Sequence, residues 1–232
     1  MKEIAIKVWK KLRKVLLYLF LFSILSVIFF RFIPIPLTPL MLIRCNEQLW
    51  SGKKLKLKKD WTSLENMSPY MAKAVMASED QLFMEHWGFD THSIKKAFES
   101  NNRKKKKGIK GASTISQQVA KNVFLWPSRS WIRKGLEAYF TVLIEVFWSK
   151  KRIMEVYLNV TEMGDGIYGA EKASEIYFKR PAKKLTASEA ALIAAVLPNP
   201  RKWSPTHPTD YIHKRQEWIL FNMKRLGKIN LE

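Results

Sequence analysis

The feature of this sequence that most constrains its fold is an uncharged apolar segment close to the N-terminus. Val15 to Phe30 are 16 consecutive residues without a charged side chain. As an α-helix this segment is about 24 Å long, whereas the hydrocarbon core of a bilayer is about 30 Å thick. Flanking apolar residues, with snorkelling by Arg13, Lys14 and Arg31, can supply the difference. We therefore expect one transmembrane helix over residues 15–32.

The flanks of this segment indicate its fate and its orientation. A cleaved signal peptide is the main alternative, but residues 29–32, Phe-Phe-Arg-Phe, contain none of the small residues of a cleavage site. Six basic residues and one acidic residue precede Val15. Because cytoplasmic flanks carry an excess of Lys and Arg, residues 1–14 are predicted to be a cytoplasmic basic tail and the chain after Arg31 to lie outside the cytoplasm.

The chain is strongly basic beyond this tail as well. Its 232 residues include 41 Lys and Arg and 20 Asp and Glu, a formal net charge of +21. After residue 14 there remain 35 basic and 19 acidic residues, which give +16. A basic domain held outside the cytoplasm meets lipid phosphates rather than DNA. The single cysteine, Cys45, excludes an intramolecular disulfide and a Cys-rich zinc module.

Proline and capping signals divide the rest of the chain. Pro34, Pro36 and Pro39 interrupt an apolar stretch, so residues 33–60 are predicted to form a connector at the lipid surface rather than a continuing helix. From residue 61 onward helix signals dominate and strand signals are few. The expected helices are one from Ser68-Pro69 toward Glu79, two that begin at capping boxes in Thr114–Gln117 and Thr186–Glu189, and those over 152–160, 169–178 and 211–226.

The longest periodic apolar pattern predicts a further helix. Its members are Ile132, Leu136, Phe140, Leu143, Ile144 and Phe147. At about 100° per residue they form one stripe, which we expect to pack into the core. Residues 61–232 are therefore predicted to form one mainly α domain, of ordinary size for a single domain.

Three polar clusters accompany these helices, and the first contains Ser78, Glu79 and Asp80, with Phe83 nearby. Carboxylates at a helix C-terminus face an unfavourable dipole, which costs stability. That cost is the physical reason to consider Glu79 as a general acid or base. A solvated acidic helix end accounts for these residues equally well.

The second and third clusters are basic or neutral. The polar members of the second are Ser113, Thr114, Gln118, Lys121 and Asn122. The small and hydroxyl residues would expose backbone N–H groups at a helix N-terminus to an anion. Gln118, Lys121 and Asn122 share one polar face, although a solvated face is the commoner meaning of such a pattern. The third cluster, Arg133, Lys134 and Glu137, can line a cleft, or it can form an ordinary ion pair worth about 0.3–0.5 kcal/mol.

The other charged features carry less information. His86 and His92 lie six residues apart, which fits no single helix face, and no further His, Cys or Glu completes a metal site. No metal held by the protein alone is therefore predicted. The run Lys104–Lys107 is most simply a solvated loop that also attracts anionic lipid.

The order and spacing of these clusters resemble the peptidoglycan glycosyltransferase family, glycosyltransferase family 51. The matching blocks are Glu79–Phe83 with His86 and Gly88; Gly111–Gln118 with Lys121 and Asn122; Arg133-Lys134 with Glu137; Arg152–Asn159 with Gly164, Gly169 and Tyr177-Phe178; and Ser188–Leu192 through Pro198–Pro200. Five ordered blocks are far more specific than any one of them. Ala112 and Ser116 stand where many bifunctional members have Gly and Thr, and residues 103–110 correspond to a loop of the family.

The resemblance implies a lysozyme-like helical fold with a small membrane-associated jaw. It implies an enzyme that polymerises lipid II into β-1,4-linked glycan strands, with inversion and release of undecaprenyl pyrophosphate, in cell wall synthesis. Because no transpeptidase domain fits before Glu232, the chain resembles the family's monofunctional biosynthetic transglycosylases of Gram-negative bacteria. The expected location is the bacterial inner membrane, with a single crossing and the catalytic domain in the periplasm.

Carried over residue by residue, the resemblance gives roles to the clusters. Glu79 would be the base that takes the proton of the acceptor hydroxyl, and Glu137 matches the second essential glutamate. Lys121, Arg133 and Lys134 would hold the pyrophosphate, which gains charge as it leaves. Further substrate-binding candidates are Asp80, Phe83, Ser113, Thr114, Gln118, Asn122, Arg152 and Asn159. The resemblance also implies a divalent cation, Mg or Mn, at the substrate pyrophosphate, and no organic cofactor.

Three other classes of protein compete with this interpretation. A DNA-binding protein would require the apolar segment near the N-terminus to be a core helix rather than a membrane span. A lytic transglycosylase or lysozyme-type hydrolase also uses a catalytic glutamate, but it has no need of three cations near Glu79. A membrane-anchored scaffold would bind anionic lipid without any catalytic residue. The partners that the resemblance implies are lipid II, the growing glycan strand, the membrane and cell-division or elongation proteins, with no nucleic acid.

Overall fold

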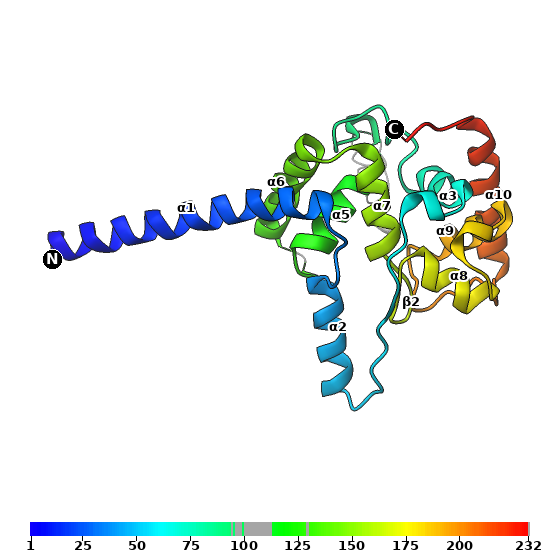
Figure 1. Ribbon diagram of the computed structural model, residues 1–232, viewed down its shortest axis with the longest axis horizontal. Helices are drawn as coiled ribbons and strands as arrows, with labels where there is room; N and C mark the ends of the chain where they lie inside the picture. Colours follow the sequence, from blue (N-terminus) through cyan, green and yellow to red (C-terminus); the bar gives the residue numbers. More distant parts are fainter. Residues whose placement is uncertain (94, 96–98, 100–112, 129, 232) are drawn as a thin grey trace. The chain divides into compact units, whose positions relative to one another are not determined.

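The computed structural model describes residues 1–93, 95, 99, 113–128 and 130–231. It divides into two compact units, Met1–Pro34 and Ile35–Glu232 (Figure 1). The predictions for residues 103–110, including the lysine run, and for Gly111 and Ala112 lie outside the described residues.

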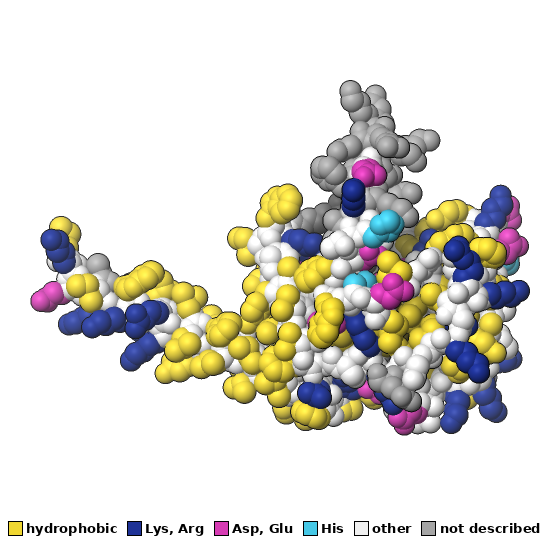
Figure 2. Space-filling view, turned by 90° about the horizontal axis from the view of Figure 1, so that it is seen from above, with side chains coloured by type: hydrophobic (Ala, Val, Ile, Leu, Met, Phe, Trp, Pro, Cys, Tyr) yellow, Lys and Arg dark blue, Asp and Glu magenta, His cyan; other side chains and the backbone are white. Residues whose placement is uncertain are grey.

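The first unit is a single helix, α1, from Lys2 to Phe32. Among the described residues it is the one helix that is long and apolar enough to cross a membrane. Its 31 residues are about 46 Å long, so the helix includes the predicted basic tail as well as the apolar segment. Figure 2 shows the basic side chains gathered at its N-terminal end and apolar side chains along the rest.

The second unit is built mainly of helices, as predicted. They are α2 (Pro39–Trp50), α3 (Pro69–Glu79), α5 (Ile115–Phe124), α6 (Trp131–Phe147), α7 (Lys150–Val160), α8 (Ala170–Phe178), α9 (Ala187–Val196) and α10 (Asp210–Arg225), with short 3-10 turns η1 (Leu64–Asn66) and η2 (Ala182–Lys184). Ser68 caps α3, and both predicted capping boxes are present, at the starts of α5 and α9. These predictions from local sequence are confirmed.

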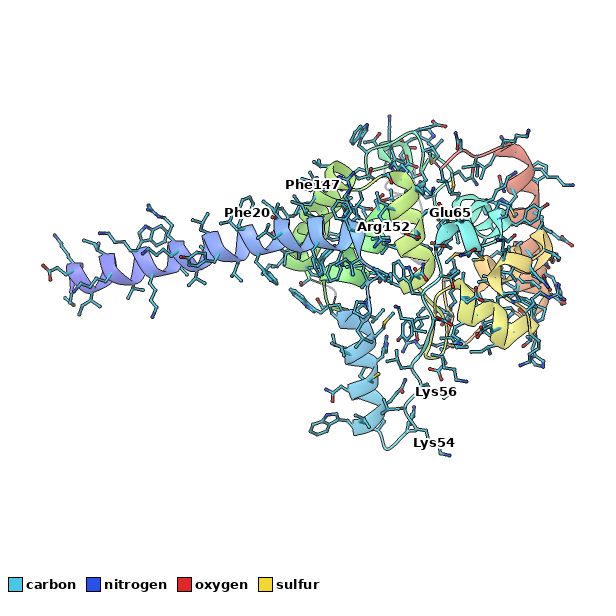
Figure 3. All side chains as sticks on the ribbon, viewed as in Figure 1. Phe20, Lys54, Lys56, Glu65, Phe147 and Arg152 are labelled. Atoms are coloured by element: carbon cyan, nitrogen blue, oxygen red, sulfur yellow. The ribbon has the colours of Figure 1, made fainter. Side chains whose placement is uncertain are left out.

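A small three-stranded sheet includes the segment that precedes α3. Its strands are β1 (Lys58–Lys59), β2 (Glu162–Gly164) and β3 (Ile167–Tyr168), in the order β1-β3-β2, with β1 parallel and β2 antiparallel to β3. Gly166 turns the hairpin with φ of 72°, and an added Cβ would lie 2.3 Å from the Lys56 carbonyl oxygen, so glycine is required there. The Lys56 side chain pairs with Asp165 at 2.6 Å (Figure 3).

The segment predicted as a connector contains a helix. As predicted, α1 does not continue, because Ile33 is extended. Pro39, however, occupies the first turn of α2, where proline is tolerated, and the Thr38 hydroxyl oxygen accepts a hydrogen bond from Met41 N–H at 3.3 Å. Lys59 Nζ then donates to the Ile35 carbonyl at 2.7 Å, so the segment from residue 35 to residue 59 closes on itself.

Helix α6 forms as predicted, but its buried face is a different one. Its buried residues are Glu137, Thr141, Ile144 and Glu145. Of the predicted apolar stripe, Ile144 is fully buried and Leu136, Phe140, Leu143 and Phe147 are half-buried, with the Phe140 ring stacked on Phe124 of α5. Ile132, by contrast, is 77% exposed, so the prediction that the stripe packs into the core is wrong at its first member. The buried face tolerates polar residues because they are paired: Glu145 accepts hydrogen bonds from Ser116 Oγ and from Lys150 Nζ.

The core has two groups of helices (Figure 1). Helices α3, α9 and α10 pack on one another, and α5 packs against both α6 and α7. Most of α9 is buried because it is apolar on nearly all sides. The C-terminal end of α3 meets the N-terminal end of α5, so residues at these two helix ends lie where the two groups join.

Candidate active site

Glu79 is the last residue of α3, and its carboxylate is held by neighbours from three helices. Gln118 Nε2 of α5 donates to Oε2 at 3.0 Å, and Ser78 Oγ donates to Oε1 at 3.2 Å. Arg215 Nη2 of α10 lies 3.8 Å from Oε1. Because the Glu79 side chain is 17% exposed, the carboxylate is oriented yet still accessible.

Asp80 fixes the helix end on which Glu79 sits. Its side chain is 1% exposed; Oδ1 lies 2.8 Å from His86 Nε2, and Oδ2 accepts the Ile115 N–H at 3.0 Å. The carboxylate therefore joins the end of α3 to the start of α5. Both oxygens have partners within the protein, so Asp80 positions the helix end, and its predicted contact with substrate stays a prediction.

Gln118 is oriented by a buried tyrosine. The Tyr157 hydroxyl lies 3.5 Å from Gln118 Oε1 and donates to it, which leaves the amide nitrogen to donate to Glu79. Burial raises the pKa of Tyr157 well above its ordinary value, and the nearby Glu79 charge adds to this effect. The phenol therefore stays protonated, and the amide keeps one orientation.

Lys121 lies one turn beyond Gln118 on α5 and connects Glu79 with the third cluster. Burial lowers its pKa. Glu137 and Glu79 oppose this shift, whereas Arg133 and Lys134 add to it. Because all four charges act on Lys121, the structure brings the three predicted clusters into one site.

Glu137 lies under the basic residues of this site. Its side chain is 3% exposed and accepts from Arg133 Nη1 at 2.6 Å and from Lys134 Nζ. A nearly buried carboxylate between two cations is not the solvated ion pair that the sequence left open. The arrangement holds both cations in place, with Lys134 the more exposed of the two.

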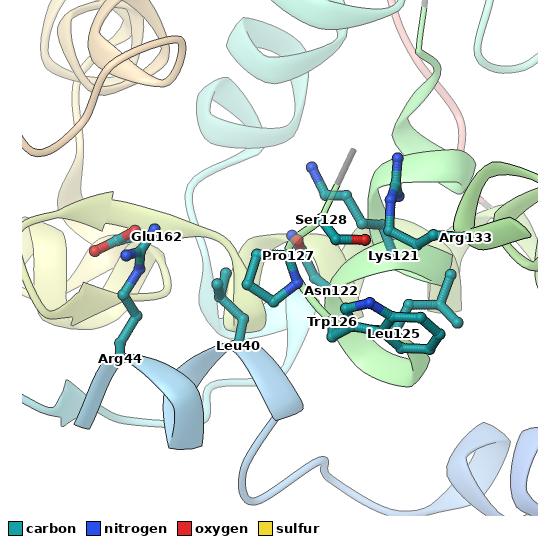
Figure 4. Close-up of a pocket in the computed structure, with 10 residues that line it drawn as sticks. All are labelled: Leu40, Arg44, Lys121, Asn122, Leu125, Trp126, Pro127, Ser128, Arg133 and Glu162. Carbon is teal, nitrogen blue, oxygen red and sulfur yellow. The ribbon is translucent and has the colours of Figure 1, made fainter. Parts of the chain in front are cut away.

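A cavity of about 470 Å³ opens beside the cations (Figure 4). It is lined by Leu40, Arg44, Lys121, Asn122, Leu125, Trp126, Pro127, Ser128, Arg133 and Glu162. Asn122, one of the predicted substrate-binding residues, is mostly buried and lies in this wall. Lys121 and Arg133 therefore face a partly open cavity.

Four other predicted substrate-binding residues make contacts within the protein, and their predicted roles stay predictions. Phe83 and Asn159 are fully buried, and the Asn159 amide is fastened to the backbone of Thr62. Thr114 caps α5, and its hydroxyl donates to the Gly88 carbonyl at 2.7 Å. Arg152 pairs with Glu155 at 2.5 Å and lies over the Trp61 ring. Ser113 is exposed at the edge of the described residues.

Three residues at the site were not predicted: Arg215, Arg44 and Ser128. Arg215 Nη2 also donates to Ser78 Oγ at 3.2 Å, across a separation of 137 residues. Arg44 comes from α2, within the segment predicted as a connector, and Ser128 follows α5. No local pattern marks any of these residues, because each reaches the site only through tertiary packing.

The site does not fit a metal held by the protein alone. In the part of the chain that the structure describes, no three His, Cys, Asp or Glu side chains converge. The Glu137 oxygens accept from Arg133 and Lys134, and those of Asp80 from Ile115 and His86. We therefore derive no chemical step through a metal.

A mainly α domain with an oriented carboxylate beside three cations and a second, buried glutamate defines a class of enzyme that displaces an anionic leaving group. The chain belongs to the transglycosylase family, whose model matches residues 47–224. This result confirms the resemblance and the lysozyme-like fold that it implied.

Curated relatives cover most of the chain. A protein of Bdellovibrio bacteriovorus is 54% identical over 216 residues, which are 91% of this chain and 86% of the relative. One of Bacteroides thetaiotaomicron is 52% identical over 222 residues, 96% of this chain and 89% of the relative. One of Escherichia coli is 54% identical over 195 residues, 84% of this chain and 80% of the relative. All three are named biosynthetic peptidoglycan transglycosylase.

Proposed function

We propose that this chain is a peptidoglycan glycosyltransferase that polymerises lipid II into β-1,4-linked glycan strands during cell wall synthesis. Family membership and the names of the relatives support this function. The observation that carries it at the level of chemistry is the position of Lys121. It lies one turn after Gln118, which donates to Glu79, and it lines the same cavity as Arg133.

The reaction assigns Glu79 to the acceptor. The 4-hydroxyl oxygen of one lipid II attacks the anomeric carbon of the growing strand, and the bond from that carbon to the phosphate oxygen breaks. Glu79 takes the hydroxyl proton, and undecaprenyl pyrophosphate leaves with the bonding electrons. Gln118 and Ser78 orient the carboxylate, since both donate to it. Inversion at the anomeric carbon gives the β bond.

The cations serve the leaving group. Lys121, Arg133 and Lys134 stabilise negative charge that increases as the pyrophosphate departs, and groups positioned in advance do this without reorganising. Glu137 keeps Arg133 and Lys134 in position, because it accepts from both. A lytic transglycosylase or lysozyme-type hydrolase acts on a polymer without a pyrophosphate, so this cation set does not favour that alternative.

The location of the enzyme follows from α1 and from apolar side chains on the second unit. We infer that α1 crosses the inner membrane once, with the catalytic unit in the periplasm, because basic residues precede its apolar segment. Trp50 on α2 is 86% exposed, and Trp131 and Ile132 on α6 are 92% and 77% exposed. Their exposure supports the proposal that these helices touch lipid as the family's jaw. Cell-division or elongation proteins remain proposed neighbours.

We further propose that a divalent cation, Mg or Mn, takes part only together with the substrate. Magnesium is commonly bound by one or two carboxylates plus substrate phosphates, and the pyrophosphate supplies such oxygens. The chemistry that the ion would contribute is neutralisation of phosphate charge. None of the steps above depends on it.

The function is tested with purified full-length protein in detergent micelles and labelled lipid II. We expect a polymer that lysozyme digests to small fragments. A parallel reaction with finished glycan strands distinguishes the hydrolase alternative, because the proposed enzyme leaves them intact. Lipid II that stays monomeric across a range of detergents and divalent cation concentrations would contradict the proposal.

A further inference from the structure

Some residues that line the cavity beside the cation cluster carry buried side-chain atoms without hydrogen-bond partners. In the described part of the chain seven buried side-chain atoms lack a partner, and three of them belong to residues that line this cavity: Arg44 Nε, Ser128 Oγ and Arg133 Nε. More than about 90% of buried polar groups in proteins are hydrogen-bonded, so this concentration requires an explanation. Arg44 Nε and Arg133 Nε are donors, and a hydroxyl can donate as well, which indicates a ligand rich in acceptors.

The charge of the lining favours an anion. Arg44, Lys121 and Arg133 contribute three cations, and Glu162 contributes one carboxylate. Burial raises the pKa of Glu162, and its Oε1 accepts from the N–H of Gly166 at 3.4 Å. The excess of positive charge matches a pyrophosphate monoester, which is a multiply charged anion at neutral pH.

The remaining wall of the cavity is apolar. Leu40 and Pro127 lie between Arg44 and Arg133, and Leu125 and Trp126 lie near Arg133 (Figure 4). Trp126 is 43% exposed, so part of its ring surface is available to a ligand. An anionic group next to a hydrocarbon chain satisfies both kinds of wall, whereas a free inorganic anion would leave the apolar one uncovered.

We propose that Arg44 and Ser128 form one side of a binding site for a polyprenyl pyrophosphate. The pyrophosphate would lie between Arg44 and the pair Lys121 and Arg133, with its first isoprene units against Leu125 and Trp126. This inference rests on the proposed function, whose leaving group has this chemistry. It adds two residues that lie outside the five sequence blocks.

The assignment gives α2 a direct part in substrate binding. Arg44 lies on the same helix as the exposed Trp50, and its Nη1 pairs with Glu47 one turn later, which limits its rotamers. The helix proposed to touch lipid therefore also carries a cation for the group that joins the lipid to the sugar.

The test measures binding without turnover. The full chain in detergent micelles is titrated by calorimetry with farnesyl pyrophosphate, a short polyprenyl pyrophosphate. We expect Arg44→Gln to weaken binding about tenfold, as expected for a lost charged hydrogen bond, and Ser128→Ala to weaken it by a smaller factor. Arg44→Lys, which keeps the charge, should restore part of the loss. Arg225→Gln on α10 is the matched control and should bind as the wild type does.

Three further ligands identify which part of the molecule is recognised. Inorganic pyrophosphate lacks the chain, farnesol lacks the charge, and dihexanoyl phosphatidylglycerol presents a phospholipid head group. We expect each to bind at least about tenfold more weakly than farnesyl pyrophosphate. Equal binding of inorganic pyrophosphate or of the phospholipid would overturn the assignment to a polyprenyl pyrophosphate.

The proposed role of Arg44 and the proposed function are contradicted by different results. If Arg44→Gln and Ser128→Ala have wild-type melting temperatures and bind farnesyl pyrophosphate as the wild type does, the inference is wrong, even when the wild type polymerises lipid II. If the wild type does not polymerise lipid II, the proposed function is wrong whatever the binding data show.

Discussion

At the scale of single residues, Glu79 carries the proposed proton transfer. We expect Glu79→Gln to lower turnover by about 10²- to 10⁴-fold while the affinity for lipid II changes little. A glutamine keeps an oxygen for Gln118 and Ser78 to donate to, but it does not accept a proton at neutral pH. Initial rates over a range of lipid II concentrations give kcat and KM separately. Polymerisation near the wild-type rate would leave Glu137 as the remaining glutamate of the pair.

The protonation of Lys121 is expected to set an alkaline limit on activity. Its pKa is lowered from 10.5, chiefly by burial, so the cation is lost at a lower pH than in an ordinary lysine. Because the charged form attracts the pyrophosphate, kcat/KM should fall on the alkaline side before pH 10.5. In Lys121→Arg the guanidinium stays charged, so this fall should move to higher pH. Superimposable alkaline limbs in the two pH profiles would show that Lys121 does not control them.

The site was predictable to the extent that its residues follow a local pattern. Glu79, Gln118, Lys121 and Glu137 were identified because their spacing matches ordered blocks. Arg215 was not, because its contact with the site depends on how α10 packs against α3, and no spacing along the chain encodes that packing. Asp80, Phe83 and Asn159 match the blocks equally well, but they are buried, and a spacing along the chain does not distinguish buried from accessible residues.

At the scale of the elements, helix starts were predictable and buried faces were less so. Capping is local, and the hydrogen bonds at Ser68, Thr114 and Thr186 formed as expected. The buried face of α6 depends on partners supplied by other helices, so Glu145 is buried while Ile132 is exposed. Helix α2 was missed because prolines read as helix breakers also occur at helix starts.

The exposed apolar side chains of α2 and α6 predict how the second unit meets a bilayer. We expect residues 35–232 to bind lipid vesicles, and the double variant Trp50→Gln with Trp131→Gln to bind about tenfold more weakly, because two large aromatic side chains no longer enter the lipid. Co-sedimentation with vesicles measures this. Trp218→Gln is the matched control, since Trp218 on α10 is 47% exposed.

Anionic and neutral vesicles separate the two contributions to this binding. Basic charge should strengthen binding to anionic vesicles at low salt, whereas the apolar contribution should persist at high salt. Binding that the double variant retains in full, with Trp218→Gln alone reduced, would place the lipid contact on α10.

At the scale of the whole molecule, the basic flank of α1 predicts one orientation. A reporter fused after Glu232 should be active only in the periplasm, because the basic residues before Val15 oppose transfer of the N-terminus. Replacing those basic residues with glutamine should reduce the fraction of chains in this orientation. Reporter activity in the cytoplasm of cells with the unaltered chain would contradict both the topology and the proposed function.

Removal of divalent cations tests whether the stability of the folded protein depends on a bound metal. We expect a chelator to slow polymerisation without lowering the melting temperature of the substrate-free protein, because no described set of carboxylates and imidazoles converges to hold an ion. Thermal unfolding with and without chelator measures this. A clear fall in melting temperature would reveal a structural ion that the proposal does not include.

The bond from Lys59 Nζ to the Ile35 carbonyl has a consequence for how such a protein can change over evolution. The segment from residue 35 to residue 59 projects from the rest of the second unit and returns to the point where it began, so α2 forms one side of a projecting arm (Figure 1). Extra helical turns at its outer end would extend its reach while the point of entry into the catalytic unit stayed fixed. A longer arm would thus enlarge the contact with the lipid surface, without any change to the residues that perform the reaction.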